Sequence, residues 1–360
     1  MLVIVCLGLT VVMIYTLVKN ALVGTQLSQN DEFSGSVDLI IPVTPNSEFY
    51  LGPWKERLGK IQKANLNIHV LIDGHHHSIN AWQELKETLP CLQIHSFLLK
   101  PHERTAIPWM IEQVKHKITS DIVIIGDSEL FPLEATFLSL GKLITEKQKS
   151  YFVLPQTAKR NILGEAIAVL NPTLALTSVF GFKKIRKNIS HPLLSISQGY
   201  MAMSQENFKE LEWAKINIYS WKEAIAKAWD IEGKTYVLAF GEKLLQRFYP
   251  EDVKVQIHQL IQSWGTLWKH GDRTGLFLYL SVLFLWAYPV LCFFVNPFSS
   301  LASLLLLVLY RFFTKIVFQE RWSAMALHLF GAIVGVGTFI YWVFLEIRSK
   351  FDKNKFKTLQ

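Results

Sequence analysis

The chain of 360 residues is long enough for one large domain or two ordinary ones, and half of its residues are hydrophobic. Its net charge of +8 is dispersed, and no stripe of basic residues with interleaved aromatics lies outside the apolar segments, which argues against nucleic-acid binding. Cys6 and Cys292 fall in apolar segments and Cys91 opens a predicted strand, so no disulfide framework is expected.

The hydrophobic excess is concentrated at the two ends of the chain. Residues 1–18 are apolar and end at Lys19, without the basic start or cleavage site of a signal peptide. We therefore predict that residues 1–19 form a retained membrane anchor. Residues 20–35, which are rich in Gln, Ser, Asn and Gly, are predicted to form a polar linker.

A C-terminal membrane region with two or three spans is predicted over residues 274–347. It contains three apolar blocks, at residues 276–298, 301–318 and 324–347. The first and third are long enough to cross a bilayer, which needs about 20 apolar residues. Arg311 and Lys315 interrupt the second block, which fits a tilted span, half of a hairpin or a helix lying in the interface.

The basic tail, residues 348–360, helps to choose between these arrangements. The positive-inside rule favours a cytoplasmic tail, and a cytoplasmic globular domain then requires three spans in total. We therefore expect the second apolar block to lie in the interface. Residues 251–273 are predicted to form an amphipathic interfacial segment, with Trp264 and Trp268 on one helical face.

Residues 36–250 alternate predicted strands and helices. The strands are predicted at residues 37–43, 67–73, 91–99, 121–126 and 151–155, and the helices that separate the first four at residues 49–63, 78–88 and 105–118. Such alternation predicts an α/β domain with a mostly parallel sheet and right-handed crossovers.

Acidic residues follow two of these strands. Asp73 ends the second strand, and Asp127 and Glu129 follow the fourth, which is apolar and β-branched. In extended backbone, residues two apart point the same way, so Asp127 and Glu129 could share one Mg²⁺ or Mn²⁺ that is also bound by substrate phosphates. The alternative is a solvated acidic turn. The sequence contains no glycine-rich phosphate loop.

Several segments together match one family. They are the opening strand 37–42, Asp73, Asp127-Ser128-Glu129 in the place of a DxD motif, the glycine-bearing segment 197–204, and residues 247–264 followed by Gly271. In this order they resemble the family 2 inverting glycosyltransferases with a GT-A fold. The similarity is closer to the membrane-attached bacterial branch that includes 4,4'-diaponeurosporenoate glycosyltransferase, and it spans nearly the whole chain.

The resemblance implies a membrane-bound, hexosyltransferase-like enzyme whose GT-A domain faces the cytoplasm. A nucleotide sugar, UDP-linked by family analogy, would contact Asp73 and Asp127, with Mg²⁺ or Mn²⁺ at Asp127 and Glu129. The acceptor, a lipid or another amphiphile, would lie beside Gly199 and Trp264.

The sequence departs from the family at the catalytic acid pair. Counting back from Gly233 by the family's spacing reaches Trp221-Lys222, which offers no carboxylate. The adjacent Glu223 is the candidate base, ahead of Asp230 and Glu242. Thr266 stands where the family has lysine. These departures leave a second hypothesis open, a catalytically degenerate relative that acts as a nucleotide-sugar-binding or scaffold subunit.

Overall fold

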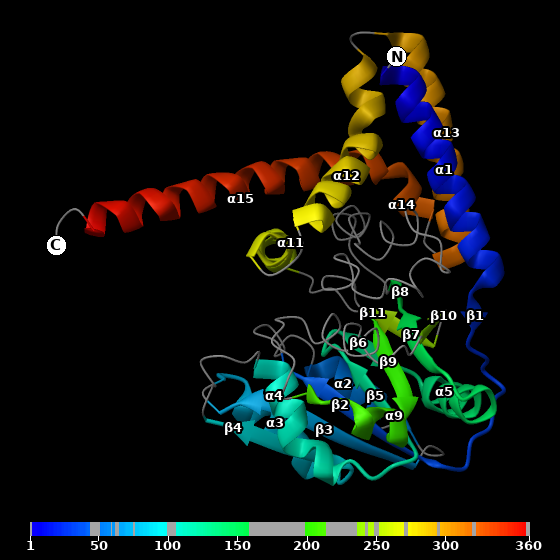
Figure 1. Cartoon of the computed structure of the whole chain (residues 1–360), viewed down its shortest axis with the longest axis vertical. Coiled ribbons are helices and arrows are strands. Elements are labelled where there is room, and N and C mark those ends of the chain that lie inside the picture. Colours follow the sequence, from blue (N-terminus) through cyan, green and yellow to red (C-terminus); the bar gives the residue numbers. More distant parts are fainter. Residues whose placement is uncertain are drawn as a thin grey trace.

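The computed structural model describes residues 2–43, 51–58, 60–61, 65–74, 76–98, 106–157, 199–213, 236–241, 244–247, 252–269, 273–293, 296–318 and 322–357. Figure 1 shows two parts, a sheet domain that contains the middle of the chain and a helical part that joins its two ends. The candidate catalytic residue Glu223, with Asp230, Gly233 and Glu242, lies outside the described residues.

An eight-stranded sheet forms the centre of the sheet domain, in the order β1-β10-β7-β9-β5-β2-β3-β4. Every neighbouring pair is parallel except the two pairs made by β9, which is antiparallel to both β5 and β7. The strands are β1 (Thr25–Gln26), β2 (Ser36–Pro42), β3 (Asn65–Asp73), β4 (Leu92–Phe97), β5 (Ile122–Gly126), β7 (Ser150–Leu154), β9 (Tyr200–Ser204) and β10 (Tyr236–Phe240). The predicted α/β class with a mostly parallel sheet is confirmed.

Both faces of the sheet are covered, which explains the unbroken apolar runs in its central strands. In β5, Ile122 and Ile124 point into one core, and Val123 and Ile125 point into the other. The first core contains residues of α2 (Leu51–Leu58), α3 (Ile79–Thr88) and α5 (Glu134–Lys147). The second contains residues of α4 (Ala106–Val114) and α9 (Gln205–Glu210), and it continues into the helical part.

A second, three-stranded sheet lies beside the carboxyl ends of the central strands. It joins β6 (Leu130–Pro132), β11 (Leu245–Arg247) and β8 (Gln156–Thr157). Leu130 pairs with Arg247, so the chain that leaves β5 folds back at once to meet a segment more than a hundred residues later. Arg57 on α2 donates to Gln246 Oε1 at 2.7 Å, which ties α2 to the same sheet.

The predicted linker, residues 20–35, packs against the sheet domain. Residues 25 and 26 form the edge strand β1 beside β10, and Leu27 is buried. Asp31 accepts hydrogen bonds from Lys142 Nζ at 2.8 Å and from Ser139 Oγ at 2.7 Å, both on α5. Most residues of this segment are partly or fully exposed to solvent, which agrees with its polar composition. The segment connects α1 to β2 and is held against the sheet domain by these contacts.

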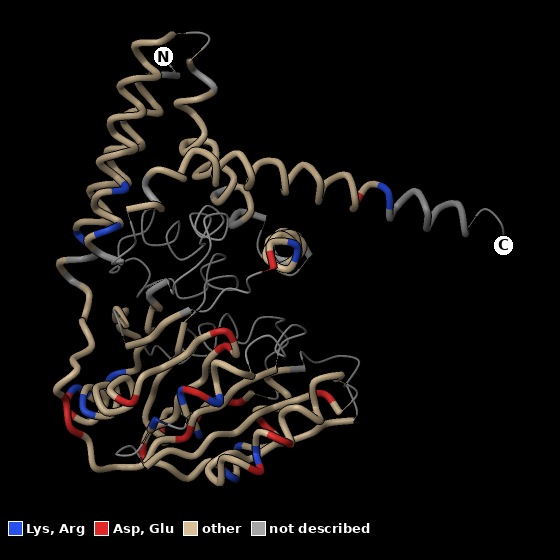
Figure 2. Tube along the Cα trace, turned by 180° about the vertical axis from the view of Figure 1, so that it is seen from behind, with Lys and Arg blue, Asp and Glu red and all other residues tan. Residues whose placement is uncertain are grey.

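The helical part consists of α1 (Leu2–Val23), α11 (Val253–Lys269), α12 (Arg273–Phe293), α13 (Pro297–Phe318), α14 (Trp322–Ala326) and α15 (His328–Lys357). Among the described residues, two segments are long and apolar enough to cross a membrane by length and composition, Pro297–Ile316 and His328–Arg348. Ile4–Asn20 and Tyr279–Val290 are shorter apolar helices. Figure 2 shows that the described charged residues gather in the sheet domain and are sparse in the helical part.

Helices α1, α12 and α13 pack against one another as a bundle, and α15 leaves this bundle sideways (Figure 1). Helix α13, for which the sequence predicts a position in the interface, packs along α1 and α12, and its position relative to a membrane stays a prediction.

Candidate functional site

The strand order reverses beside β2, and this reversal marks the place at the carboxyl ends of the strands where a ligand can bind. Strands β3 and β4 follow β2 on one side, and β5 lies on its other side. In open α/β sheets a crevice forms outside the carboxyl ends of the strands at such a switch point. Asp127 is the first residue after β5, and Asp73 is the last residue of β3. The structure thus brings both predicted site residues to one edge.

The sheet register gives the distance between these two carboxylates. Ile125 of β5 and His69 of β3 both pair with Ile40 of β2. Asp73 consequently lies two strands across from Asp127 and about two residues further along. With strands about 4.8 Å apart and a rise of about 3.3 Å per residue, the two Cα atoms are about 12 Å apart. Asp73 is too far from Asp127 to share its ion, but one nucleotide-sized ligand could contact both.

The acidic tripeptide lies in a tight turn. Leu130 N donates to Asp127 O at 3.1 Å, and residues 128 and 129 form the turn that leads into β6. Asp127 and Glu129 are half-buried, and Ser128 is buried. The extended backbone assumed from the sequence is wrong, because the chain has to reverse to pair with β11. Shared ion binding by the two carboxylates therefore stays a prediction that spacing alone does not support.

A tryptophan from α2 holds this turn on one side. Trp54 is fully buried, and its Nε1 donates to Ser128 O at 2.8 Å. Its ring packs at a tilt against Phe131 of β6, with the ring centroids 5.3 Å apart. Because the hydrogen bond goes to the backbone of the turn, Trp54 fixes the position of Ser128 whatever ligand is present.

A tyrosine from β9 holds the turn on the other side. The Tyr200 hydroxyl donates to Leu130 O at 3.0 Å. A Cβ at Gly126 would lie 2.2 Å from the Tyr200 ring, so the glycine that ends β5 makes room for it. Burial and then the negative charge of Asp127 raise the pKa of the Tyr200 phenol well above its usual range, which keeps it a neutral donor. We call Trp54 and Tyr200 the turn clamp.

Trp54→Phe is expected to loosen the turn. The substitution keeps a large ring but removes the donor to Ser128 O, and an unsatisfied buried carbonyl costs about 1–3 kcal/mol of unfolding free energy. Amide hydrogen exchange at residues 128–130 should also become faster, as measured by mass spectrometry on the full chain.

Trp82→Phe is the matched control. Trp82 on α3 is fully buried, and its Nε1 has no hydrogen-bond partner among the described residues. Trp82→Phe should leave the exchange at residues 128–130 unchanged. It should also lower the free energy of unfolding by less than Trp54→Phe does. Equal effects of the two substitutions would contradict the assigned role of the Trp54 hydrogen bond.

Asp127 and Glu129 suit a divalent cation whose remaining ligands come from substrate phosphates and water. Within the described part of the chain, no group of three or more His, Cys, Asp or Glu side chains could hold a metal ion. Mg²⁺ is commonly bound by only one or two carboxylates together with substrate phosphates and water. Asp127 and Glu129, two hard oxygen donors on a braced turn at the switch point, suit a site of that kind.

The two residues predicted on the acceptor side lie in different places. Gly199 precedes β9 at the edge that carries Asp127, and a Cβ there would lie 2.6 Å from Val153 O, so this glycine permits close strand packing. Trp264 is fully buried among Tyr279, Phe339 and Trp342. Its ring faces neighbouring helices rather than solvent, and an acceptor role for either residue stays a prediction.

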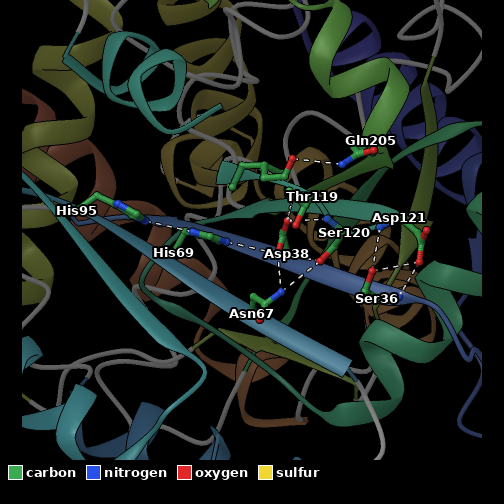
Figure 3. A network of polar contacts seen from close by, with 10 residues as sticks. Ser36, Asp38, Asn67, His69, His95, Thr119, Ser120, Asp121 and Gln205 are labelled. Carbon is green, nitrogen blue, oxygen red and sulfur yellow. Dashed lines mark hydrogen bonds and ion pairs between the residues drawn. The ribbon is translucent and has the colours of Figure 1, made fainter. Parts of the chain in front are cut away.

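Beneath the edge, a buried polar network crosses the three strands β2, β3 and β4 (Figure 3). Asp38 lies at its centre and is 1% exposed. It accepts from the backbone N–H groups of Thr119 and Ser120, from Ser120 Oγ and Asn67 Nδ2, and contacts His69 Nε2 at 3.3 Å. The network thereby fixes residues 119–120, where the chain enters β5 and is led to Asp127.

The network continues from His69 to His95, whose ring nitrogens are 3.1 Å apart. Burial, and after it the nearby charges of His69 and Lys117, lower the pKa of His95 to about 4. The imidazole is therefore neutral at pH 7.

His95 is expected to make stability fall in mild acid. Its folded pKa lies below the unfolded value, so the stabilisation is present above pH 6.5 and is lost as the pH falls toward 4. After a discount for solvent screening, the loss between pH 7 and pH 5 is about 1–2 kcal/mol. His95→Gln should flatten this dependence in urea unfolding, whereas His258→Gln, at an exposed histidine of α11, should leave it unchanged. An unaltered slope in the His95 variant would refute the assignment.

No protein-family model and no curated protein matches the sequence. Among solved structures, the mannosyltransferase PcManGT from Pyrobaculum calidifontis, in complex with GDP-Man and Mn²⁺, is similar with a TM-score of 0.49 at 12% identity, over 98% of this chain and 100% of that chain. Residues 1–349 of S. aureus TarS give 0.40 at 12% identity, and the same fragment with UDP-GlcNAc gives 0.37 at 11%, each over 84% of this chain and 89% of that chain. Similarity at this level does not assign a function to this chain.

Proposed function

We propose that this chain is a membrane-bound glycosyltransferase that moves a sugar from a nucleotide sugar to a lipid or another amphiphilic acceptor with inversion. The observation that supports this best is the pair Asp127 and Glu129 on a clamped turn at the switch point of the sheet, with Asp73 about 12 Å away at the same edge. A nucleoside diphosphate offers a base and ribose for the one site and phosphates for the other.

The three acidic residues at this edge then have two tasks. Asp73 accepts a hydrogen bond from the base or the ribose of the donor. Asp127 and Glu129 would hold Mg²⁺ or Mn²⁺, which when bound neutralises the leaving diphosphate. The UDP form of the donor, the GT-A fold and membership of family 2 come from the motif resemblance and are part of the proposal.

The transfer itself needs a base for the acceptor. The acceptor oxygen forms a bond to the anomeric carbon as the bond from that carbon to the diphosphate oxygen breaks, and the acceptor proton passes to a carboxylate. Glu223 is the proposed base. Attack from the face opposite the leaving group inverts the configuration at the anomeric carbon.

The helical part supports a membrane location and a hydrophobic acceptor. The core on one face of the sheet continues into α1, α11 and α12, so the candidate site belongs to a domain that is packed directly on apolar helices. A hydrophobic acceptor in the bilayer could reach such a domain without entering water. We place the sheet domain on the cytoplasmic side, where nucleotide sugars would be available.

A second candidate is a catalytically degenerate relative that binds a nucleotide sugar or serves as a scaffold subunit. The specific observation in its favour is Trp221-Lys222, which stands where the family's acid pair is expected. It shares the donor site with the first candidate and differs from it only in turnover.

The test is sugar transfer by the full chain in lipid nanodiscs. Radiolabelled UDP-glucose, UDP-GlcNAc and GDP-mannose are supplied with Mn²⁺, and lipid-extractable label is counted. Glu223→Gln should abolish transfer and retain donor binding. Glu206→Gln, at an exposed carboxylate near the opposite end of β9, should retain both transfer and donor binding. Donor binding without transfer by the wild type would favour the degenerate relative, and absence of both would refute the proposal.

A further inference from the structure

Helix α15 exposes an apolar stripe over residues 330–347. Phe330, Ile333, Ile340, Phe344 and Ile347 follow one another at intervals of three, four or seven residues, which places them on one face of a helix. Each is about half exposed or more, and Ile340 and Phe344 are 62% and 60% exposed. An exposed apolar surface of this length indicates contact with a partner or with lipid.

The opposite face of α15 is packed on α11 and α12. Trp264 Nε1 of α11 donates to Thr338 Oγ1 at 3.4 Å, and the Trp264 ring lies 5.3 Å from that of Phe339. Trp342, one turn after Thr338, is buried. In Figure 1, α11 lies between α15 and the sheet domain, so the stripe faces away from the sheet domain.

The direction of α15 differs from that of the apolar bundle. Helices α1, α12 and α13 run side by side along the long axis of the molecule, and α15 leaves them sideways (Figure 1). If the bundle crosses a bilayer, a helix with this direction runs along the membrane rather than through it. Helix α13 also exposes apolar side chains such as Leu301, Leu305 and Phe312, as a lipid-facing helix does.

The charge of the C-terminal tail agrees with this direction. Three crossings by α1, α12 and α13 return the chain to the side of the sheet domain, and an in-plane α15 keeps the tail there. Residues 348–357 contain five Lys or Arg and one Asp, which favours the cytoplasmic side and the anionic headgroups of that leaflet. A fourth crossing by α15 would carry these basic residues to the other side.

We propose that α15 lies in the plane of the membrane, in the leaflet next to the sheet domain, with its apolar stripe among the acyl chains and residues 348–357 bound to anionic phospholipid headgroups. In this arrangement α13 crosses the membrane and α15 lies in its plane. The sequence-based expectation was the reverse, with residues 301–318 in the interface and residues 324–347 as a span. It does not depend on the proposed transferase activity.

The test is a depth profile along α15 in vesicles of phosphatidylcholine with one quarter phosphatidylglycerol. Cys6, Cys91 and Cys292 are replaced by alanine, and a single cysteine labelled with a nitrobenzoxadiazole dye is placed at position 333, 340 or 347. Nitroxide lipids that carry the quencher at different depths report the depth of each dye. Positions 298, 305 and 312 of α13 are the matched controls, because they are also seven residues apart and exposed.

An in-plane α15 gives the same depth at its three positions within a few ångströms, while successive positions of α13 differ by up to about 10 Å, the rise of seven helical residues. A depth that changes along α15 as it does along α13 would overturn the proposal, and so would dyes on α15 that no lipid quencher reaches. As a second readout, an impermeant maleimide should label cysteines at positions 206 and 359 from the same side of the membrane. Labelling from opposite sides would also overturn it.

Discussion

Asp127→Asn is expected to abolish Mn²⁺-dependent binding of the nucleotide-sugar donor while leaving the fold intact. The substitution removes a negative charge at the switch point without changing the size of the side chain, and the residue follows the end of β5 instead of lying in a core. Mutation of a residue that only hydrogen-bonds to a metal ligand typically lowers metal affinity about 10–100-fold. Loss of a direct ligand should therefore weaken donor binding at least about 100-fold. Isothermal titration calorimetry with and without Mn²⁺ measures this.

Two neighbouring variants make the result specific. Glu129→Gln should show the same defect in a milder form, since its longer side chain can reach an ion through water. Asp73→Asn should weaken donor binding equally with and without Mn²⁺, because it lies about 12 Å from Asp127 and has no part in ion binding. If Asp127→Asn bound the donor as tightly as the wild type at saturating Mn²⁺, the tripeptide would be a solvated acidic turn and the metal assignment would fail.

Much of the sheet could be predicted because its central strands are buried on both faces. The β-branched runs of β2, β3 and β5 are apolar on both faces, so they fit a buried strand whichever face each side chain takes. The boundaries of these strands in the structure lie within two residues of the predicted ones. The acidic residues after β3 and β5 could be placed at one edge because parallel strands end on the same side. These inferences need only the local sequence and the alternation of strands and helices.

The parts that could not be predicted depend on contacts between distant segments. Residues 197–204 match a family motif, but nothing in them reveals that β9 inserts antiparallel between β5 and β7. The turn after β5 is dictated by β11, and the clamp joins Trp54 to Ser128, which are 74 residues apart. A tryptophan in an amphipathic helix looks like an ordinary core residue, and only the structure reveals that its N–H meets the turn.

The polar network under the sheet leads to the second large expected effect, because Asp38→Asn should strongly destabilise the sheet domain. Burial raises the pKa of Asp38, but hydrogen bonds from His69, Ser120 and Asn67 outweigh burial and lower the pKa to about 2. Against an ordinary value of 3.8, this corresponds to about 2 kcal/mol after a discount for solvent screening. An asparagine amide group would in addition face the N–H donors of residues 119 and 120, so the total loss should reach about 3 kcal/mol.

Asp121→Asn provides the matched control for this effect. Asp121 lies at the same end of the sheet and accepts from Ser36 N at 2.8 Å, but it is exposed to water. Its substitution should lower the free energy of unfolding by no more than about 0.5 kcal/mol, as expected for a surface site. Urea unfolding of the full chain in detergent, followed by circular dichroism, compares the two variants. Equal losses would mean that the buried network contributes nothing beyond a surface hydrogen bond.

The pH dependence separates the charge of Asp38 from its shape. The folded pKa is lower than the unfolded one, so the stabilisation by the charge is fully present above about pH 4 and is lost as the pH falls toward about 2. The stability difference between wild type and Asp38→Asn should therefore persist at pH 5 and narrow only below pH 4. The His95 effect, by contrast, is already under way at pH 6. A difference that did not change from pH 5 to pH 3 would mean that Asp38 acts in the network as a neutral hydrogen-bonding group and not as a carboxylate.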